Sequence, residues 1–324
     1  MRVLVVLTGG AGFIGSATLD ALAGSGAVRV LVVDDLSSGS MANIERHIRS
    51  GLAEMLVCDI SAPGCPAELV ARARDSRGDV AFIHLAALVG VPEARAYPER
   101  AWRSNVLGTA AMLEAARRLD ASRFVYASSA AVYGEPVRLP VDEDHPLRPA
   151  NLYGATKLAG ENLLWGYSRE YGLSAAALRY FNVYGPRMRP GPYSGVVYRF
   201  ASALLAGEKP VLHGGGHQTR DFVYVSDVAE ANVKALHSRY TGPLNVGSGT
   251  EVSILELLEA IARILGVRPS YTPAPPRPGD VSRIVADIRR AREAIGWEPR
   301  VPLEAGLRRT IEWIRQSRGL RGTH

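Results

Sequence analysis

The chain has 324 residues, of which 47% are apolar and 22% are charged, a composition typical of a folded globular protein and not of a disordered one. Its net charge of +6 comes from 38 Lys and Arg against 32 Asp and Glu. The basic residues are spread along the chain and form neither a concentrated patch nor a nucleic-acid-binding module, so we expect an anionic small molecule as partner and no nucleic acid.

The first elements form a strand, a helix and a second strand. Val3 to Leu7 is a continuous apolar run, which is typical of a strand buried on both faces of a parallel sheet. This run is followed directly by a glycine-rich turn and lacks the cleavage pattern of a signal peptide. Phe13 to Gly24 has helical apolar spacing, and Val28 to Val33 is again a strand pattern.

The alternation of strands and helices then continues. Further strands are expected at Ala53 to Cys58, Val80 to Leu85, Arg123 to Ala127 and Ala175 to Arg179, with helices near 66–76, 98–119 and 152–171. This pattern predicts an α/β fold with a doubly wound (Rossmann) parallel sheet. The apolar run Val80 to Val91 is too short to span a bilayer, so no membrane partner is expected. The two cysteines, Cys58 and Cys65, are expected as reduced thiols in the cytoplasm.

After Phe181 the composition of the sequence changes. Gly185 to Gly195 is rich in Gly, Pro and Arg and indicates a loop, Val196 to Ala206 indicates a helix, and the four prolines of Tyr271 to Gly279 argue against regular structure. We therefore expect a cofactor-binding domain at 1–179 and a smaller C-terminal substrate-binding domain at 180–324. Asp221 to Asn232 has a strand-then-helix pattern that fits a return to the first domain, which would extend the first domain to residues 221–250.

A phosphate-binding turn follows the first strand. Thr8 to Gly15 contains glycines spaced as G-x-G-x-x-G, which permit a tight turn, close approach of a pyrophosphate and close helix packing. The helix that begins there supplies backbone amides and a partial positive charge. Asp34 stands 19 residues after Gly15, at the end of the second strand. An acid at that place binds the adenosine ribose hydroxyls and repels a 2′-phosphate, which predicts NAD over NADP as cofactor.

Tyr153 and Lys157 form a Y-x-x-x-K pair in a predicted helix. Positions i and i+4 share a helix face, and a nearby ammonium favours the phenolate, which makes Tyr153 a candidate general base. The chain has only three lysines, at 157, 209 and 234, so a lysine in this pattern is informative.

Together these motifs resemble the extended short-chain dehydrogenase/reductases of the nucleotide-sugar epimerase/dehydratase family, most of all the UDP-hexose 4-epimerases. The resemblance covers nearly the whole chain. It rests on Thr8–Gly15, Val33–Gly39, Asp59-Ile60, His84–Ala87, Asn105, Ser128–Gly134, Tyr153–Lys157, Leu178–Arg187, Gln218–Phe222 and Arg277–Asp280.

The resemblance implies a role for each matching residue. Catalysis would involve Tyr153, Lys157 and Ser129, which would hydrogen-bond the reacting sugar hydroxyl. The NAD site would consist of Gly9, Gly12, Phe13, Ile14, Gly15, Asp34, Asp59, Ile60, Leu85, Ala86, Asn105 and Lys157, with Asp59 and Ile60 at the adenine and Asn105 near the nicotinamide. The UDP-sugar would be held by Ser129, Tyr153, Asn182, Arg187, Arg220, Arg277 and Asp280. Arginines suit a diphosphate because guanidinium pairs bidentately with its oxygens. No metal is expected.

The two residues that directly follow Ser129 favour one reaction within the family. Relatives that dehydrate carry Asp and Glu there, whereas this chain has Ala130 and Ala131, which transfer no proton. The resemblance therefore implies inversion at C4 of a UDP-sugar through a transient 4-keto intermediate. An atypical dehydratase with the same initial oxidation and a non-catalytic NAD-binding regulator are the alternatives.

The resemblance leaves the sugar open. UDP-glucose/UDP-galactose is preferred, and UDP-glucuronate/UDP-galacturonate follows closely, because in relatives that act on uronic acids the arginine at the position of Arg187 meets the carboxylate. Ile284 stands where some relatives have a Tyr that limits space for N-acetyl groups, so N-acetylhexosamines also remain open. A homodimer through the helices near 98–119 and 152–171 is expected by analogy.

Overall fold

The computed structural model describes residues 3–26, 28–74, 78–191, 194–277 and 279–319. Its centre is a parallel seven-stranded sheet in the order β10-β6-β5-β4-β1-β2-β3. The strands are β1 (Val3–Thr8), β2 (Val28–Asp34), β3 (Ala53–Val57), β4 (Val80–His84), β5 (Arg123–Ser129), β6 (Ala175–Tyr180) and β10 (Gly242–Val246). This order, with the chain moving outward from β1 in both directions, confirms the doubly wound α/β fold.

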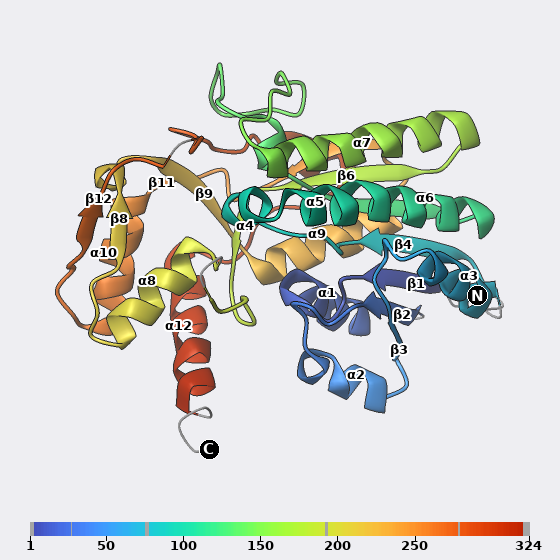
Figure 1. Ribbon diagram of the computed structural model, residues 1–324, viewed down its shortest axis with the longest axis horizontal. Helices are drawn as coiled ribbons and strands as arrows, with labels where there is room; N and C mark the ends of the chain where they lie inside the picture. Colours follow the sequence, from blue (N-terminus) through green and yellow to red (C-terminus); the bar gives the residue numbers. More distant parts are fainter. Residues whose placement is uncertain (1–2, 27, 75–77, 192–193, 278, 320–324) are drawn as a thin grey trace.

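Helices cover both faces of this sheet, as Figure 1 shows. One face packs against α3 (Gly64–Arg74), α6 (Gly108–Arg118) and α7 (Leu152–Tyr171). The other packs against α1 (Phe13–Ala23), α9 (Val225–His237) and α11 (Arg289–Ile295), while α2 (Glu45–Arg49) lies beside β3. Both faces of the strands are therefore buried, which explains their nearly continuous apolar sequences.

The stretch near 98–119 is not one regular helix. It consists of α5 (Pro98–Trp102), a π-helical turn over Arg103–Leu107 and then α6, and it follows the short α4 (Val91–Ala96). The π turn brings Asn105 into the interior, where its side chain is 1% exposed. Such turns are frequent at functional sites. The predicted helix near 66–76 corresponds to α3, and residues 75–76 lie outside the described residues.

A smaller part of the molecule lies beyond one end of the large sheet (Figure 1). It contains a three-stranded sheet of β7 (Asn182–Tyr184), β9 (Thr219–Tyr224) and β11 (Glu251–Ser253), and a pair formed by β8 (Val211–His213) and β12 (Thr272–Ala274). The helices α8 (Val196–Leu205), α10 (Ile254–Leu265) and α12 (Leu303–Gly319) share its core. A capping box between Ser253 and Glu256 starts α10, and Gly266 in the left-handed region ends it.

The chain passes between the two parts more than once. After β9, which belongs to the three-stranded sheet, α9 packs on α1 and β10 pairs in parallel with β6 as the seventh strand of the large sheet. Residues 225–246 thus lie on the large sheet although 182–224 do not. Among the described residues, no helix is long and apolar enough to cross a bilayer.

Two expectations were wrong. The proline-rich segment does contain a strand, β12, whose Pro273 is in register with Leu212 of β8. A two-stranded pair has only edge strands, and an edge strand tolerates proline because one row of its N–H groups needs no partner. The two cysteines are not reduced thiols: Cys58 and Cys65 form a disulfide. The first turn of α3 folds back onto the end of β3 and places their Cα atoms 5.7 Å apart, within disulfide reach.

Candidate active site

A cleft of about 1120 Å³ lies at the carboxyl ends of the large sheet's strands and extends to the smaller part. This is where open α/β sheets bind ligands. The sequence-predicted residues that line it are Gly9, Gly12, Phe13, Ile14, Gly15, Asp34, Asp59, Ile60, Leu85, Ala86, Ser129, Tyr153, Lys157, Asn182, Arg187, Arg220, Arg277 and Asp280. The fold thus gathers side chains from distant parts of the sequence around one cavity.

Asn105 is the predicted residue that does not line this cleft. Its Nδ2 donates to the carbonyl oxygen of Leu88 (3.0 Å) and to Oγ1 of Thr156 (2.9 Å), and its Oδ1 accepts from the backbone N–H of Leu88 (2.8 Å). These bonds use the polar atoms of the side chain. Asn105 therefore connects the loop after β4, which does line the cleft, to the helix that carries Tyr153.

The glycine turn is shaped for close approach of a ligand. Gly9 has a φ of +69°, and a Cβ on Gly15 would lie 2.0 Å from the carbonyl oxygen of Gly9. Gly12 caps α1 without a side-chain hydrogen bond, so no side chain competes for the first amides of the helix. The Thr8 hydroxyl accepts from the N–H groups of Leu85 (3.2 Å) and Ala86 (3.1 Å) and fixes the turn against the end of β4.

Asp34 closes the far end of the cleft. Its Oδ2 accepts from the N–H of Ala11 (3.0 Å) and its Oδ1 from the N–H of Leu36 (2.9 Å). Burial raises the pKa of the carboxyl group, and these two hydrogen bonds oppose that rise. The carboxylate is thereby held at the edge of the glycine turn. Asp59, after β3, is fixed in a similar way because its Oδ1 accepts from the backbone N–H of Ser61 at 2.8 Å.

Tyr153 and Lys157 project from the first two turns of α7 into the cleft, near the end of β5. The Nζ of Lys157 donates to the carbonyl oxygen of Ala127 (2.9 Å), and burial lowers the pKa of Lys157 to about 7. Burial raises the pKa of Tyr153 to about 12, while a hydrogen bond with Ser129 acts in the opposite direction. In the protein alone, therefore, burial keeps the phenol protonated. A general base at this position needs added positive charge next to Tyr153.

Three arginines gather at the part of the cleft formed by the smaller region. Arg220 forms an ion pair with Asp280, and Arg277 lines the wall beside it. The third is Arg199 of α8, which was not predicted from the sequence. Its Nε is buried and has no hydrogen-bond partner among the described residues, and burial, followed by the charge of Arg277, lowers its pKa to about 10. The available signal was that Arg199 is the lone charged residue of an apolar helix, Val196 to Leu205.

Arg187 lines the cleft, but its guanidinium is directed to α1. Its Nη2 donates to Asp20 at 2.8 Å, and Asp20 also pairs with Arg46 and His47. The residue itself has a φ of +69°. Its neighbour Arg189 lies instead at the end of the cleft near Tyr153, where its Nη1 lies 3.0 and 3.2 Å from the two carboxylate oxygens of Glu93.

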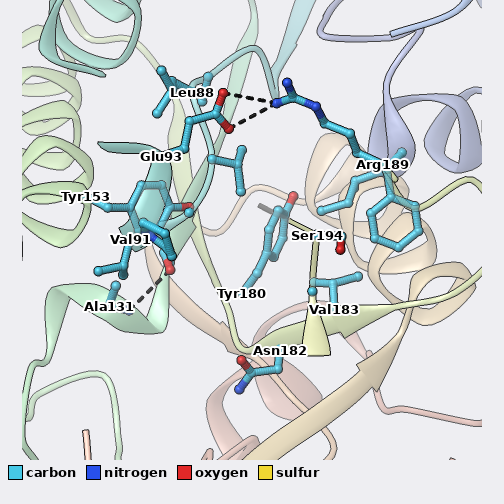
Figure 2. Close-up of a pocket in the computed structure, with 18 of the residues that line it drawn as sticks. Leu88, Val91, Glu93, Ala131, Tyr153, Tyr180, Asn182, Val183, Arg189 and Ser194 are labelled. Carbon is cyan, nitrogen blue, oxygen red and sulfur yellow. Dashed lines mark hydrogen bonds and ion pairs between the residues drawn. The ribbon is translucent and has the colours of Figure 1, made fainter. Parts of the chain in front are cut away.

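Figure 2 shows this end of the cleft. Tyr153 and Tyr180 face the cavity, the Glu93–Arg189 pair lies on one side, and Asn182 of β7 lies on the other. Ala131 is close to Tyr153, and Ala130 and Ala131 both line the cleft. The positions that follow Ser129 thus offer no proton donor or acceptor side chain to a molecule bound there.

The residues present fit a dinucleotide. The glycine turn and the amides of α1 suit a pyrophosphate, Asp34 suits ribose hydroxyls, and the cleft continues from there to Tyr153. In this position the residues Gly9, Gly12, Gly15 and Asp34 would hold the adenosine diphosphate part, and Lys157 the ribose next to the nicotinamide.

Comparison with known proteins agrees with this geometry. The NAD dependent epimerase/dehydratase family matches residues 5–247. UDP-glucose 4-epimerase of Mycolicibacterium smegmatis is 41% identical over 317 residues, which are 97% of this chain and 99% of the relative. Among solved structures, UDP-glucose 4-epimerase of Thermotoga maritima with UDP-glucose is 36% identical, with a TM-score of 0.89 and coverage of 98% and 99%. UDP-glucuronic acid 4-epimerase of Bacillus cereus, in complex with UDP-glucuronic acid and NAD, is 30% identical, with a TM-score of 0.89 and coverage of 98% and 100%.

The fold and the cleft define a dinucleotide-dependent enzyme of the extended short-chain type. More particularly, the chain belongs to the NAD dependent epimerase/dehydratase family, and its cofactor is NAD.

Proposed function

We propose that this protein is a UDP-sugar 4-epimerase that inverts C4 through a transient 4-keto sugar. The observation that carries the proposal is the sugar end of the cleft, where Tyr153 and Ser129 stand beside Ala130 and Ala131. These residues can move the proton of one hydroxyl group but cannot expel water from neighbouring carbons. The relatives that bind UDP-glucose and UDP-glucuronic acid support the same assignment.

The side chains have separate tasks in this reaction. Tyr153 takes the proton of the C4 hydroxyl and returns it when the alcohol forms again on the opposite face. Ser129 hydrogen-bonds the same oxygen and keeps it at Tyr153. Lys157, beneath them, lowers the pKa of Tyr153 when it is protonated. NAD supplies the hydride acceptor, and later the donor, at C4.

The remaining predicted residues hold the nucleotide. Arg220 and Arg277 bind the diphosphate, and Arg199 adds a third cation to this set. Asp280 keeps Arg220 in place through their ion pair. We assign the cofactor to residues 1–179 together with 221–250, and the nucleotide-sugar to 180–324. The return of α9 and β10 to the large sheet supports the part of this division from 225 to 246, whereas residues 221–224 belong to β9 of the three-stranded sheet.

The decisive experiment needs no added cofactor. The purified protein is incubated separately with UDP-glucose, UDP-glucuronate and UDP-N-acetylglucosamine, and the products are identified by NMR. C4 epimers at equilibrium are expected for at least one sugar. A stable 4-keto product that has lost its C6 hydroxyl signal would instead identify a dehydratase, and the absence of any turnover would identify a non-catalytic NAD-binding protein.

We also propose that the protein acts in the cytoplasm, where NAD and nucleotide-sugars occur together, as a homodimer through the surface of α5 to α7. That surface exposes Trp102 and Leu107, which are five residues apart across one π-helical turn, and neighbouring exposed apolar side chains are typical of interfaces. Cell fractionation tests the location. Light scattering during gel filtration tests the dimer, and a W102E/L107E variant that remains as large as the wild type contradicts this interface.

A further inference from the structure

Glu93 is a buried carboxylate at the sugar end of the cleft. It lies in α4, after the loop that Asn105 holds, and its side chain is only 6% exposed. The other carboxylates among the described lining residues are elsewhere: Asp34, Asp35 and Asp59 are at the adenosine end, and Asp280 pairs with Arg220. Glu93 is therefore the carboxylate that the described lining places at this end of the cleft, with Arg189 beside it (Figure 2).

Arg189 is the partner of this carboxylate. One nitrogen, Nη1, reaches both oxygens of Glu93, while 47% of the Arg189 side chain stays exposed. A carboxylate removed from water requires a cation, so Glu93 keeps Arg189 at this wall of the cleft. The neighbouring Arg187 does not compete for Glu93 because its guanidinium pairs with Asp20.

The Glu93–Arg189 pair should interact differently with neutral and acidic sugars. The hydroxymethyl group of a neutral hexose can donate to Glu93 or accept from Arg189 and leave the pair intact. The carboxylate of a hexuronate would have to share Arg189 with Glu93, and the two like charges would then lie against one guanidinium in a partly dry pocket. Arg189, which could otherwise attract the carboxylate of a hexuronate, is thus already neutralised by Glu93.

From these contacts we infer that Glu93 is a specificity-determining residue: it occupies Arg189 and restricts the site to UDP-sugars that are neutral in the hexose. This inference rests on the proposed function and names its substrate class. Removal of the negative charge alone releases Arg189 to bind a hexuronate carboxylate.

Dissociation constants for UDP-glucose and UDP-glucuronate, measured by titration calorimetry, test the inference. The wild type is expected to bind UDP-glucose more tightly. Glu93→Gln keeps the shape of the side chain and is expected to shift the ratio of the two constants toward UDP-glucuronate by about tenfold, the lower end of the range for close charge pairs at interfaces, because Arg189 stays half-exposed. In the double variant E93Q/R189Q the gain should disappear, because it depends on the released guanidinium.

Glu99→Gln is the matched control, since Glu99 is exposed on α5 and does not line the cleft. It should leave the ratio of the constants unchanged. A wild-type preference for UDP-glucuronate, a ratio in E93Q within twofold of wild type, or a gain that persists in the double variant overturns the inference.

Turnover is measured on the same proteins. It distinguishes a failure of the proposed C4 inversion from a failure of the role given to Glu93. If the binding ratios shift as expected but no variant inverts C4, the proposed reaction is wrong and the selectivity of the pocket stands. If C4 is inverted but the ratios do not shift, the reaction stands and the role of Glu93 is refuted.

Discussion

Arg199 is expected to lower the stability of the ligand-free protein and to raise its affinity for UDP. Replacement of Arg199 by methionine allows the two effects to be measured separately. The guanidinium is held in the cleft with its Nε unpaired among the described residues, and burial lowers its pKa from 12.5 to about 10. One pKa unit corresponds to about 1.4 kcal/mol, so the charged form costs the folded protein about 3 kcal/mol at most. At neutral pH Arg199 is charged in both the folded and the unfolded chain. The buried charge therefore destabilises the folded protein at neutral pH, and this destabilisation decreases only above pH 10.

Arg199→Met keeps most of the aliphatic stem and removes the charge. The free energy of unfolding of the ligand-free protein should therefore rise by about 1–3 kcal/mol, with an increase in Tm of about 2–4 °C per kcal/mol. Binding of UDP should weaken roughly 10- to 100-fold, because a hydrogen bond to a charged group contributes about 1.5–3 kcal/mol.

Thermal unfolding without ligand and titration calorimetry with UDP measure the two quantities. Arg308→Met is the control, since this exposed residue of α12 pairs with Glu304 one turn away, and its effect on the free energy of unfolding should stay within about 0.5 kcal/mol. A variant at 199 that unfolds at a lower temperature and binds UDP as tightly as wild type would refute the reasoning.

Three further predictions concern the catalytic helix and the glycine turn. Tyr153→Phe should lower kcat for C4 inversion by about 10²- to 10⁴-fold while the dissociation constant for UDP stays within twofold; near wild-type turnover would remove Tyr153 as the base. Because the pKa of Lys157 is about 7 in the folded protein and about 10.4 in an unfolded chain, the unfolded chain binds more protons between these values and stability rises with pH. Urea unfolding at pH 7.5 and 9.5 should thus show a gain of about 2 kcal/mol in the wild type that is missing from Lys157→Met, and equal pH dependence would contradict the buried lysine. Gly15→Ala puts a Cβ 2.0 Å from the carbonyl oxygen of Gly9, so NAD in the purified protein should fall at least tenfold, whereas Gly166→Ala, which meets open space, should retain it.

Six of the seven strands of the large sheet could be predicted because each is a largely apolar run, whereas β10, with the sequence Gly-Pro-Leu-Asn-Val, has no such pattern and was not predicted. The glycine turn and the Tyr153–Lys157 pair could also be recognised in the sequence because both are local patterns. Sequence could not show that Asn105 turns away from the cleft, because that depends on a π turn between α5 and α6. Nor could it single out Arg199 or the Glu93–Arg189 pair, which arise from contacts between distant segments in a chain with many arginines.

The return of α9 and β10 to the large sheet has a consequence for dissection of the gene. A fragment that ends at residue 179 would lack both elements, although they cover α1 and complete the outer edge at β6. The unpaired backbone of β6 would then be open to another chain, and the surface under α9 would be open to water. We therefore expect a fragment of residues 1–179 alone to be less stable and more prone to aggregate than one in which residues 225–246 are joined to position 179 through a new linker.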